Sequence, residues 1–475
     1  MTSGPSSRAK YDLVVIGAGP AGEKGAAQAA YHGKSVAIVD PSPRPGGIAM
    51  STAGIPTKAL REGAIYLSGL GQSAFAAPAP GGQDAWSLLA ARKVEVSDFL
   101  IKAVERNLVR HRVERILGLA RLLPGPAVEV TRPGAEPLRL EADVVLIACG
   151  SRPRHLDGVP MSDPDVHDVE TILSIDRPPG SLVVVGDGSA GCEYASIFAA
   201  LGVRVTIVSP GDHLLPALDG EIARVLAECF NGLGIRVIPL TPVERVTRVG
   251  DALEVTLGNG KTIPAAKVLV AVGRCPSVSG LGLEEAGVES TSAGWVRVDA
   301  HYATTAPRVF AAGDVLGPPA LASVSMEQAR VAMCHAFGIP FKTEADRLRP
   351  SYTFSIPEAA SVGQTEEEVK ASGVEYDVGR CSFMTNAKAR ISGFPDGLVK
   401  LLFRVPDKAL LGIHIVGEMA SELIHIGQFV LKDGGTLDRF IDATFAVPTR
   451  SEAYKYAAYD GLTRLERRLE THRER

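Results

Sequence analysis

Residues 11–22 read Tyr-Asp-Leu-Val-Val-Ile-Gly-Ala-Gly-Pro-Ala-Gly, and this stretch decides how the first part of the chain folds. Its apolar half, Tyr11–Ile16, predicts a buried β-strand, and an alanine-rich helical stretch follows its glycines. A second apolar strand at 35–39 ends in Asp40, an acid that can accept hydrogen bonds from a ribose. This order of strand, glycine turn, helix, strand and acid predicts a βαβ unit that binds a dinucleotide. The glycines that let the backbone approach a pyrophosphate at the helix N-terminus are Gly17, Gly19 and Gly22.

The same pattern occurs a second time in the middle of the chain. The strand 182–185 runs into Gly-Asp-Gly-Ser-Ala-Gly at residues 186–191, then into a helix and a further strand at 203–208. A second glycine turn predicts a second dinucleotide, and the economical interpretation is one site for FAD and one for a nicotinamide nucleotide, NAD or NADP. The glycines of this second turn are Gly186, Gly188 and Gly191.

The second strand of this repeat ends without an acid at the place where the ribose 2′-hydroxyl would be read. Ser209 stands there, and no dense arginine cluster is present to hold a 2′-phosphate. A neutral hydroxyl can bond either to a ribose hydroxyl or to a phosphate oxygen, so Ser209 leaves the choice between NAD and NADP open. We therefore expect both nucleotides to be accepted, with efficiencies within about tenfold of each other.

Further segments carry short patterns whose order and spacing are specific when taken together. Residues 46–58 read Gly-Gly-Ile-Ala-Met-Ser-Thr-Ala-Gly-Ile-Pro-Thr-Lys, and 309–314 read Val-Phe-Ala-Ala-Gly-Asp. Two other apolar strands end in glycine turns, at Gly150 and Gly273. From residue 352 onward the chain changes to alternating β-type runs and helices, which predicts a separate α+β part.

On these motifs the chain resembles, over nearly its whole length, the group I pyridine nucleotide-disulfide oxidoreductases, and within them the soluble pyridine nucleotide transhydrogenases. The resemblance implies an α/β fold with two doubly wound dinucleotide-binding domains, for FAD and NAD(P), and a C-terminal α+β dimerisation domain. It also implies a homodimer. The implied domains are 1–155 with 281–349 for FAD and the central region, 156–280 for NAD(P), and 350–475 for the interface.

The resemblance also assigns roles to single residues. It implies that Asp314 bonds to the ribityl chain of FAD, and that the other cofactor-binding residues outside the two repeats are Gly47, Gly150 and Gly273. It implies that Lys58, which follows the motif proline, pairs with Glu193 near the flavin N5 atom. A cation there would stabilise the reduced flavin, so we take Lys58 and Glu193 as the candidate catalytic residues. His425 lies on an apolar helical face, where a histidine is more often packed than catalytic.

The chain departs from that family at the groups that carry thiol chemistry. The family's Gly-Gly-x-Cys-x4-Cys-x-Pro has Ala49 and Gly54 in place of its cysteines here, and neither residue can form a thiolate. The family's His-Pro-Thr-x-x-Glu reads Val-Pro-Thr-Arg-Ser-Glu, so Val447 replaces the histidine that serves as acid and base. Because the two sites form one constellation, their joint loss predicts a flavoenzyme that hands on a hydride without sulfur.

Composition excludes several other classes of protein. The chain has 475 residues and a net charge of -4, which leaves no basic field for nucleic acid. Its six cysteines are scattered, which argues against a disulfide scaffold or a zinc site and suits a reducing cytosol. No apolar run approaches the roughly 20 residues of a membrane helix, and no secretory signal is evident. We expect a cytoplasmic protein with no metal and no membrane partner.

Three functions fit these observations. The first is a transhydrogenase that passes hydride between NADPH and NAD⁺ through FAD. The second is an NAD(P)H:quinone reductase of the same fold, since a quinone pocket has no short motif that the sequence could reveal. The third is a non-catalytic flavoprotein scaffold, against which the retained nicotinamide-site glycines argue, because a scaffold has no need of that site.

Overall fold

The computed structural model describes residues 10–70 and 83–473. The chain divides into two compact units, each assembled from three separate stretches. Unit 1 is Met1–Pro56, Lys93–Arg154 and Gly273–Arg347. Unit 2 is Thr57–Arg92, His155–Val272 and Leu348–Arg475. Residues 1–9 and 71–82 of the implied FAD domain, and 474–475 of the implied interface domain, lie outside the described residues.

Unit 1 is built on one seven-stranded sheet with the order β3-β2-β1-β6-β5-β4, in which β17 also pairs with β6. Strands β1, β2, β3, β6 and β17 are parallel, whereas β4 and β5 add an antiparallel hairpin. The strands are β1 (Lys10–Ile16), β2 (Val36–Asp40), β3 (Glu114–Leu117), β4 (Leu119–Leu123), β5 (Ala127–Thr131), β6 (Leu138–Ile147) and β17 (Val309–Ala311). A short ladder of β7 (Ser151–Pro153) and β16 (Arg274–Pro276) completes the unit's strands among the described residues.

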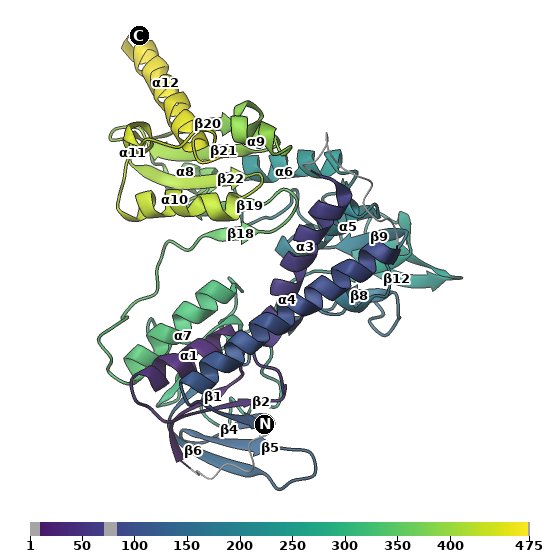
Figure 1. The fold of residues 1–475 in the computed structure, drawn as a ribbon, viewed down its shortest axis with the longest axis vertical. Coiled ribbons are helices and arrows are strands. Elements are labelled where there is room, and N and C mark those ends of the chain that lie inside the picture. The colour runs from purple at the N-terminus through teal and green to yellow at the C-terminus, as the bar shows by residue number, and fades with distance from the viewer. Residues whose placement is uncertain (1–9, 71–82, 474–475) are drawn as a thin grey trace. The chain divides into compact units, whose positions relative to one another are not determined.

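Helices α1 (Pro20–Tyr31) and α7 (Ala322–Ala336) lie side by side in unit 1 (Figure 1). A Cβ atom on Gly25 would lie 2.5 Å from Leu146 Cδ2 and 3.4 Å from Ala329 Cβ. A glycine at this point of α1 therefore lets the helix rest directly on β6 beside α7. The unit also contains the short helix α2 (Gly47–Ser51) and shares α3 (Ile55–Ser68) and α4 (Gln83–Arg110) with unit 2.

Unit 2 contains a five-stranded parallel sheet with the order β11-β10-β9-β15-β8. Its strands are β8 (Val166–Asp168), β9 (Ser181–Val185), β10 (Arg204–Val208), β11 (Arg236–Ile238) and β15 (Lys267–Val270). Between β11 and β15 the chain forms a separate three-stranded antiparallel sheet. Its strands are β12 (Val243–Val249), β13 (Ala252–Leu257) and β14 (Thr262–Ala265). The helices of this half are α5 (Ser189–Ala200) and α6 (Gly220–Gly232). Trp86 of α4 stacks on Phe198 of α5, with ring centroids 5.9 Å apart.

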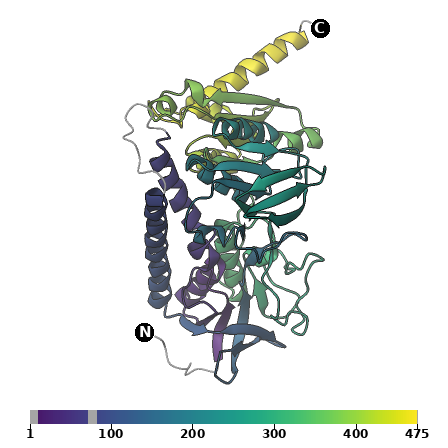
Figure 2. The ribbon, with the colours of Figure 1, turned by 90° about the vertical axis from the view of Figure 1, so that its right-hand side faces the viewer.

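The rest of unit 2 is an antiparallel sheet with the order β18-β19-β22-β21-β20. Its strands are β18 (Ser351–Thr353), β19 (Ala359–Gly363), β20 (Tyr376–Ser382), β21 (Leu398–Arg404) and β22 (Leu410–Val416). Its helices are α8 (Glu366–Ser372), α9 (Ala387–Ile391), α10 (Ala420–Lys432), α11 (Asp438–Asp442) and α12 (Ala453–Arg473). Helix α12 packs on β20 where Gly379 has no side chain, since a Cβ there would lie 2.1 Å from the Ala457 carbonyl oxygen. Figure 2 shows α12 continuing past this sheet to the C-terminal end.

These elements confirm the predicted α/β fold, with a mixed sheet in unit 1 and a parallel sheet in unit 2 that each carry a glycine turn, and with a C-terminal α+β part. No helix within residues 10–70 and 83–473 has the length and apolar character needed to cross a membrane.

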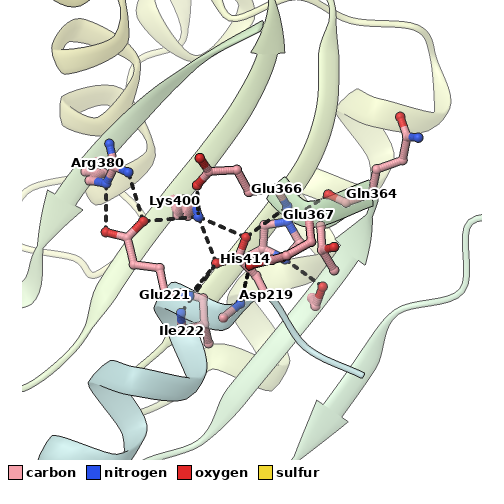
Figure 3. A network of polar contacts seen from close by, with 12 residues as sticks. Asp219, Glu221, Ile222, Gln364, Glu366, Glu367, Arg380, Lys400 and His414 are labelled. Carbon is pink, nitrogen blue, oxygen red and sulfur yellow. Dashed lines mark hydrogen bonds and ion pairs between the residues drawn. The ribbon is translucent and has the colours of Figure 1, made fainter. Parts of the chain in front are cut away.

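A buried ion-pair network joins the two halves of unit 2 (Figure 3). Lys400 of β21 is fully buried, and its Nζ lies 2.8 Å from Asp219, 3.0 Å from Glu221 and 2.6 Å from Glu366. Asp219 is also the N-cap of α6 and accepts from the first amides of that helix. Arg380 donates two hydrogen bonds to Glu221, at 2.8 and 2.9 Å. The network therefore fastens α6 and α8 to the antiparallel sheet.

Lowering the pH is expected to weaken unit 2 through this network. Burial disfavours the charged form of Glu366, but hydrogen bonds from Lys400, Lys370 and Tyr376 outweigh it and hold the pKa at about 2. The ordinary value in an unfolded chain is about 4.3. A depressed pKa contributes stability that is present above the unfolded value and is lost as the pH falls toward 2. Urea unfolding followed by Trp86 fluorescence should therefore show a midpoint that drops between about pH 5 and pH 2.

The matched control for this pH dependence is Glu366→Gln, which removes the titrating group and keeps the shape of the side chain. Its unfolding midpoint should start lower at pH 7 and fall less steeply with acid. Parallel pH profiles for the two proteins would contradict the assignment.

Candidate functional site

The first glycine turn lies at the carboxyl end of β1 in unit 1. Gly17 has a φ of +105°, and a Cβ on it would lie 2.4 Å from the Ala148 carbonyl oxygen. Gly22 packs on the same turn, since its Cβ would lie 1.8 Å from the Gly17 oxygen. Gly19 is the N-cap of α1 and has no side chain to cap it. The first N–H groups of α1 thus remain available to an anion such as a pyrophosphate.

Asp40 and Gly47 lie next to this turn. The parallel pairing of β1 with β2 places Asp40 beside the turn, where its Oδ2 accepts a hydrogen bond from Ala18 N at 2.6 Å. Gly47 opens α2 with a φ of +58°, and a Cβ on it would lie 2.9 Å from Gly19 Cα. The residues predicted from the first repeat are therefore brought together with Gly47, and the backbone is close enough that side chains would obstruct it.

Asp314, Gly150 and Gly273 complete the predicted set in unit 1. Asp314 follows β17, which pairs in parallel with β6, so it stands at the same sheet edge as the glycine turn. Its carboxylate accepts from Ser151 Oγ at 3.0 Å and from Ser325 Oγ at 3.3 Å. The sequence analysis missed both serines, because Ser151 in β7 and Ser325 in α7 meet Asp314 only once the fold is formed. Gly150 and Gly273 have φ values of +73° and +98° and form the turns that flank the β7–β16 ladder.

The second glycine turn, in unit 2, repeats the geometry of the first. Gly186 has a φ of +119°, and its Cβ would lie 2.3 Å from the Ala271 carbonyl oxygen. A Cβ on Gly191 would lie 2.5 Å from the Gly186 oxygen, and Gly188 is the N-cap of α5. A dinucleotide pyrophosphate fits this backbone for the same physical reason as in unit 1.

Ser209 differs from its sequence-based description. Its side chain is fully buried, its Oγ donates to Asp187 Oδ2 at 2.5 Å, and it accepts from Gly211 N at 3.1 Å. The hydroxyl is therefore already engaged within the protein rather than open to either nucleotide. The carboxylate of Asp187, from the glycine turn, thus lies next to Ser209 at the end of β10.

Lys58 and Glu193 are paired, as the family resemblance implies. Lys58 Nζ of α3 lies 2.7 Å from Glu193 Oε2 of α5, and the Glu193 side chain is 9% exposed. Phe354, just after β18, holds both: its N–H donates to Glu193 Oε1 at 3.0 Å, and its ring centroid lies 4.9 Å from Lys58 Nζ. Sequence reasoning missed Phe354, which is far from the other two in the chain.

In the segment that lacks the family's cysteines, the backbone of Gly54 lies close to that of Ala49. A Cβ on Gly54 would lie 2.5 Å from the Ala49 carbonyl oxygen and 2.9 Å from Ala49 Cα. The two positions are thus neighbours, as the two ends of a disulfide would be. A cysteine at position 54 would nevertheless require the backbone to move, because real Cβ atoms do not approach a carbonyl oxygen so closely.

Five of the six cysteines that the chain does have are unsuited to replace the missing pair. All six are free. Burial raises the pKa of Cys149 and of Cys229 to about 12 and that of Cys381 to about 11. Burial also raises the pKa of Cys192 and of Cys334. Because the thiolate is the reactive form, these groups are poor nucleophiles near neutral pH.

The C-terminal positions fit the same account. Val447 is 75% exposed and carries no acid–base group, whereas Glu452 is buried and accepts a hydrogen bond from Asn386 Nδ2 at 3.4 Å. His425 is exposed, and its Nδ1 lies 2.9 Å from Gln428 Oε1 on the next turn of α10. His425 is therefore exposed on α10 rather than packed on an apolar face, as the sequence pattern had suggested.

Comparison with known proteins agrees with this arrangement. The family model described as pyridine nucleotide-disulphide oxidoreductase matches residues 11–336, and the dimerisation domain of that family matches 349–458. This chain belongs to the pyridine nucleotide-disulphide oxidoreductase family.

Curated relatives narrow the comparison. The soluble pyridine nucleotide transhydrogenase of Mycobacterium tuberculosis is 39% identical over 96% of this chain and 98% of its own. That of Marinomonas is 37% identical over 96% and 99%.

Two solved structures share the fold. The HOCl-induced flavoprotein disulfide reductase RclA of Escherichia coli, as a Cu(II) complex, has a TM-score of 0.87 and 27% identity, covering 95% of this chain and 99% of its own. LpdA of Mycobacterium tuberculosis has a TM-score of 0.85 and 29% identity, covering 94% and 99%.

Proposed function

We propose that this protein is a cytoplasmic, FAD-dependent NAD(P)⁺ transhydrogenase that transfers hydride between NADPH and NAD⁺. The observation that carries the proposal is the combination of two intact glycine turns with a segment that has lost both redox cysteines. The two turns provide for a flavin and a nicotinamide nucleotide, while Ala49 and Gly54 leave no sulfur to receive the electrons. The transhydrogenases named above, similar over nearly the full chain, support the same function.

The residues present fit the two nucleotides. FAD would be held in the domain proposed at 1–155 and 281–349, and the nicotinamide nucleotides in the domain proposed at 156–280. FAD, once bound, would supply the two-electron centre that takes hydride from one nicotinamide and returns it to the next. The proposed FAD-binding residues are Gly17, Gly19, Gly22, Asp40, Gly47, Gly150, Gly273 and Asp314. The proposed nicotinamide-site residues are Gly186, Gly188, Gly191 and, acting through Asp187, Ser209.

The chain's own contribution to the reaction is electrostatic and positional. Lys58 provides a cation whose position is fixed by Glu193 and by the ring of Phe354. A preorganised charge of this kind stabilises negative charge that develops during reduction. Hydride exchange needs no general acid or base, which agrees with valine at position 447.

Anaerobic stopped-flow spectroscopy tests the proposal. The enzyme is reduced with NADPH and then mixed with NAD⁺, with a quinone or with oxygen, and the reappearance of oxidised flavin is recorded. NAD⁺ should reoxidise the flavin fastest. Faster reoxidation by quinone would identify a quinone reductase instead, and failure of every nicotinamide to reduce the flavin would identify a non-catalytic flavoprotein.

Reductive titration is expected to take up two electrons per FAD and to show no long-wavelength thiolate-to-flavin band. The reason is that Ala49 and Gly54 cannot donate charge, while the buried thiols have raised pKa values. Dithionite titration under nitrogen measures the stoichiometry. Uptake of two additional electrons, abolished by a thiol alkylator, would show that a disulfide relay exists.

The protein is expected to be a homodimer of about 100 kDa, twice the chain mass of 49.9 kDa. The dimerisation-domain match supports this, and so do the large apolar side chains that this part of unit 2 exposes. They are Met384, Ile391, Met419, Phe429, Val447, Tyr456 and Tyr459. Light scattering at micromolar concentration measures the mass, and a value near 50 kDa would count against a dimer.

A further inference from the structure

We infer that Asp187 selects between the nicotinamide nucleotides, placing a carboxylate where the 2′-phosphate of NADP(H) would lie and so favouring NAD(H). The inference rests on the proposed function for the identity of the ligand. Ser209 alone left the choice between NAD(H) and NADP(H) open, whereas the carboxylate of Asp187 favours NAD(H).

The end of β10 is the place where a nucleotide held by this glycine turn presents its adenosine ribose. The parallel ladder pairs Val208 with Val185, and Gly186 N donates to Val208 O at 3.0 Å. The glycine turn and the end of β10 are therefore adjacent by main-chain geometry. A side chain on either segment can reach the ribose.

The carboxylate at that place belongs to Asp187. Its Oδ2 accepts the hydroxyl of buried Ser209, which orients the group toward the end of β10. Its main-chain oxygen accepts from Leu215 N at 2.9 Å, so the backbone is held as well. Ser209 acts as the positioning residue, and Asp187 is the residue that meets the ligand.

Within the part of the chain that the structure describes, no lysine or arginine forms an ion pair with Asp187. His213 is the basic residue that follows Ser209 most closely in the sequence. Its Nε2 lies 3.6 Å from Asp212 Oδ1, and its Nδ1 lies 2.9 Å from the Leu214 carbonyl oxygen. Arg204 belongs to the opposite end of β10, where its Nε donates to Gly180 O.

The expected discrimination follows from the chemistry of the two ligands. A carboxylate accepts a hydrogen bond from the ribose 2′-hydroxyl of NAD(H), whereas it repels the 2′-phosphate of NADP(H). Hydrogen bonds to charged groups change binding by about 10- to 100-fold. From Ser209 alone we expected NADH and NADPH to be used with similar efficiency. With Asp187 in place we expect the site to bind NAD(H) about 10- to 100-fold more tightly than NADP(H). Both nucleotides can still exchange hydride, but at equal concentrations NAD(H) occupies the site.

Calorimetry on the FAD-loaded enzyme tests this without turnover. The probes are ADP and 2′,5′-ADP, which carry the adenosine ends of NAD and NADP. The wild type should bind ADP about 10- to 100-fold more tightly than 2′,5′-ADP. Asp187→Asn should weaken ADP and strengthen 2′,5′-ADP, bringing the two within about threefold. Asp212→Asn, which removes an exposed acid nearby, should leave the ratio unchanged.

Equal binding of the two probes by the wild type would overturn the inference, as would an Asp187→Asn ratio equal to that of the wild type. A changed ratio in Asp212→Asn would also overturn it, because the effect would then be one of general charge. The transhydrogenase proposal fails by a different readout: normal probe discrimination with no reoxidation of the flavin by NAD⁺ would remove that activity while leaving the role of Asp187 intact.

Discussion

Replacing Lys58 with methionine is expected to slow reduction of the flavin by NADH about 100- to 1000-fold while FAD stays bound. The wild-type ammonium is held 2.7 Å from Glu193 and 4.9 Å from the Phe354 ring centroid, so it is fixed before the reaction begins. A charge that needs no reorganisation is worth about 2.7 to 4 kcal/mol at comparable sites. Methionine keeps the length and apolar character of the side chain but carries no charge. Anaerobic stopped-flow at saturating NADH measures the rate.

The controls separate the lost charge from a disturbed fold. Removing Lys58 leaves the Glu193 carboxylate buried, with the Phe354 amide as its remaining partner among the described residues, which costs stability by itself. The double variant Lys58→Met, Glu193→Gln removes that problem and should remain slow. Lys58→Arg keeps a cation and should recover part of the rate. Wild-type kinetics in Lys58→Met, or full recovery in the double variant, would show that Lys58 has a structural role only.

The sequence predicted those parts of the molecule whose requirements are local. Gly17 and Gly186 are needed because a neighbouring carbonyl oxygen would lie within 2.4 Å of any Cβ, a constraint that recurs wherever a strand enters this turn. Such constraints leave a fixed spacing of glycines that can be read without coordinates. The parallel sheets follow from the same pattern, because strand and helix alternate around each turn.

The site residues that the sequence did not reveal act across long separations in the chain. Phe354 donates a hydrogen bond to Glu193, which is 161 positions away in the chain. Ser151 donates one to Asp314, which is 163 positions away. Asp187 is part of the glycine motif that the sequence shows. Its proposed role in nucleotide selection, however, depends on its contact with Ser209 at the end of β10. A pattern of residue types specifies which elements form, whereas these contacts depend on how the elements pair.

The Lys400 network likewise depends on contacts between elements that are far apart in the chain. Nothing near Lys400 in the sequence marks it as buried, because its strand β21 reads as an ordinary apolar run with one charge. Its partners come from the N-cap of α6 and from the first turn of α8. A lysine in a strand is usually taken for a surface residue, and only the packing of three elements shows that this one has a 1% exposed side chain.

Lys400→Met is expected to lower the free energy of unfolding of unit 2 by about 3 to 5 kcal/mol. In the variant, Arg380 still pairs with Glu221 and exposed Lys370 still pairs with Glu366. Fully buried Asp219 keeps no lysine or arginine partner among the described residues, and a buried charge without a partner is costly. Trp86 lies in unit 2 and is buried against Phe198, so its fluorescence follows the unfolding of this unit. Trp295, the other tryptophan, is replaced by phenylalanine in every protein compared. Urea titration at pH 7 then measures the loss.

Two further variants decide whether the loss comes from the buried charges. Lys408→Met breaks the Lys408–Asp438 pair, whose side chains are 33% and 40% exposed, and should cost less than about 1 kcal/mol. Adding Asp219→Asn and Glu366→Gln to Lys400→Met removes two of the carboxylate charges that pair with Lys400, and asparagine still caps α6. This triple variant should regain most of the lost stability. A Lys400→Met protein no weaker than Lys408→Met, or a triple variant weaker than Lys400→Met alone, would mean that the methylene packing of Lys400 rather than its charge holds α6 and α8 on the sheet.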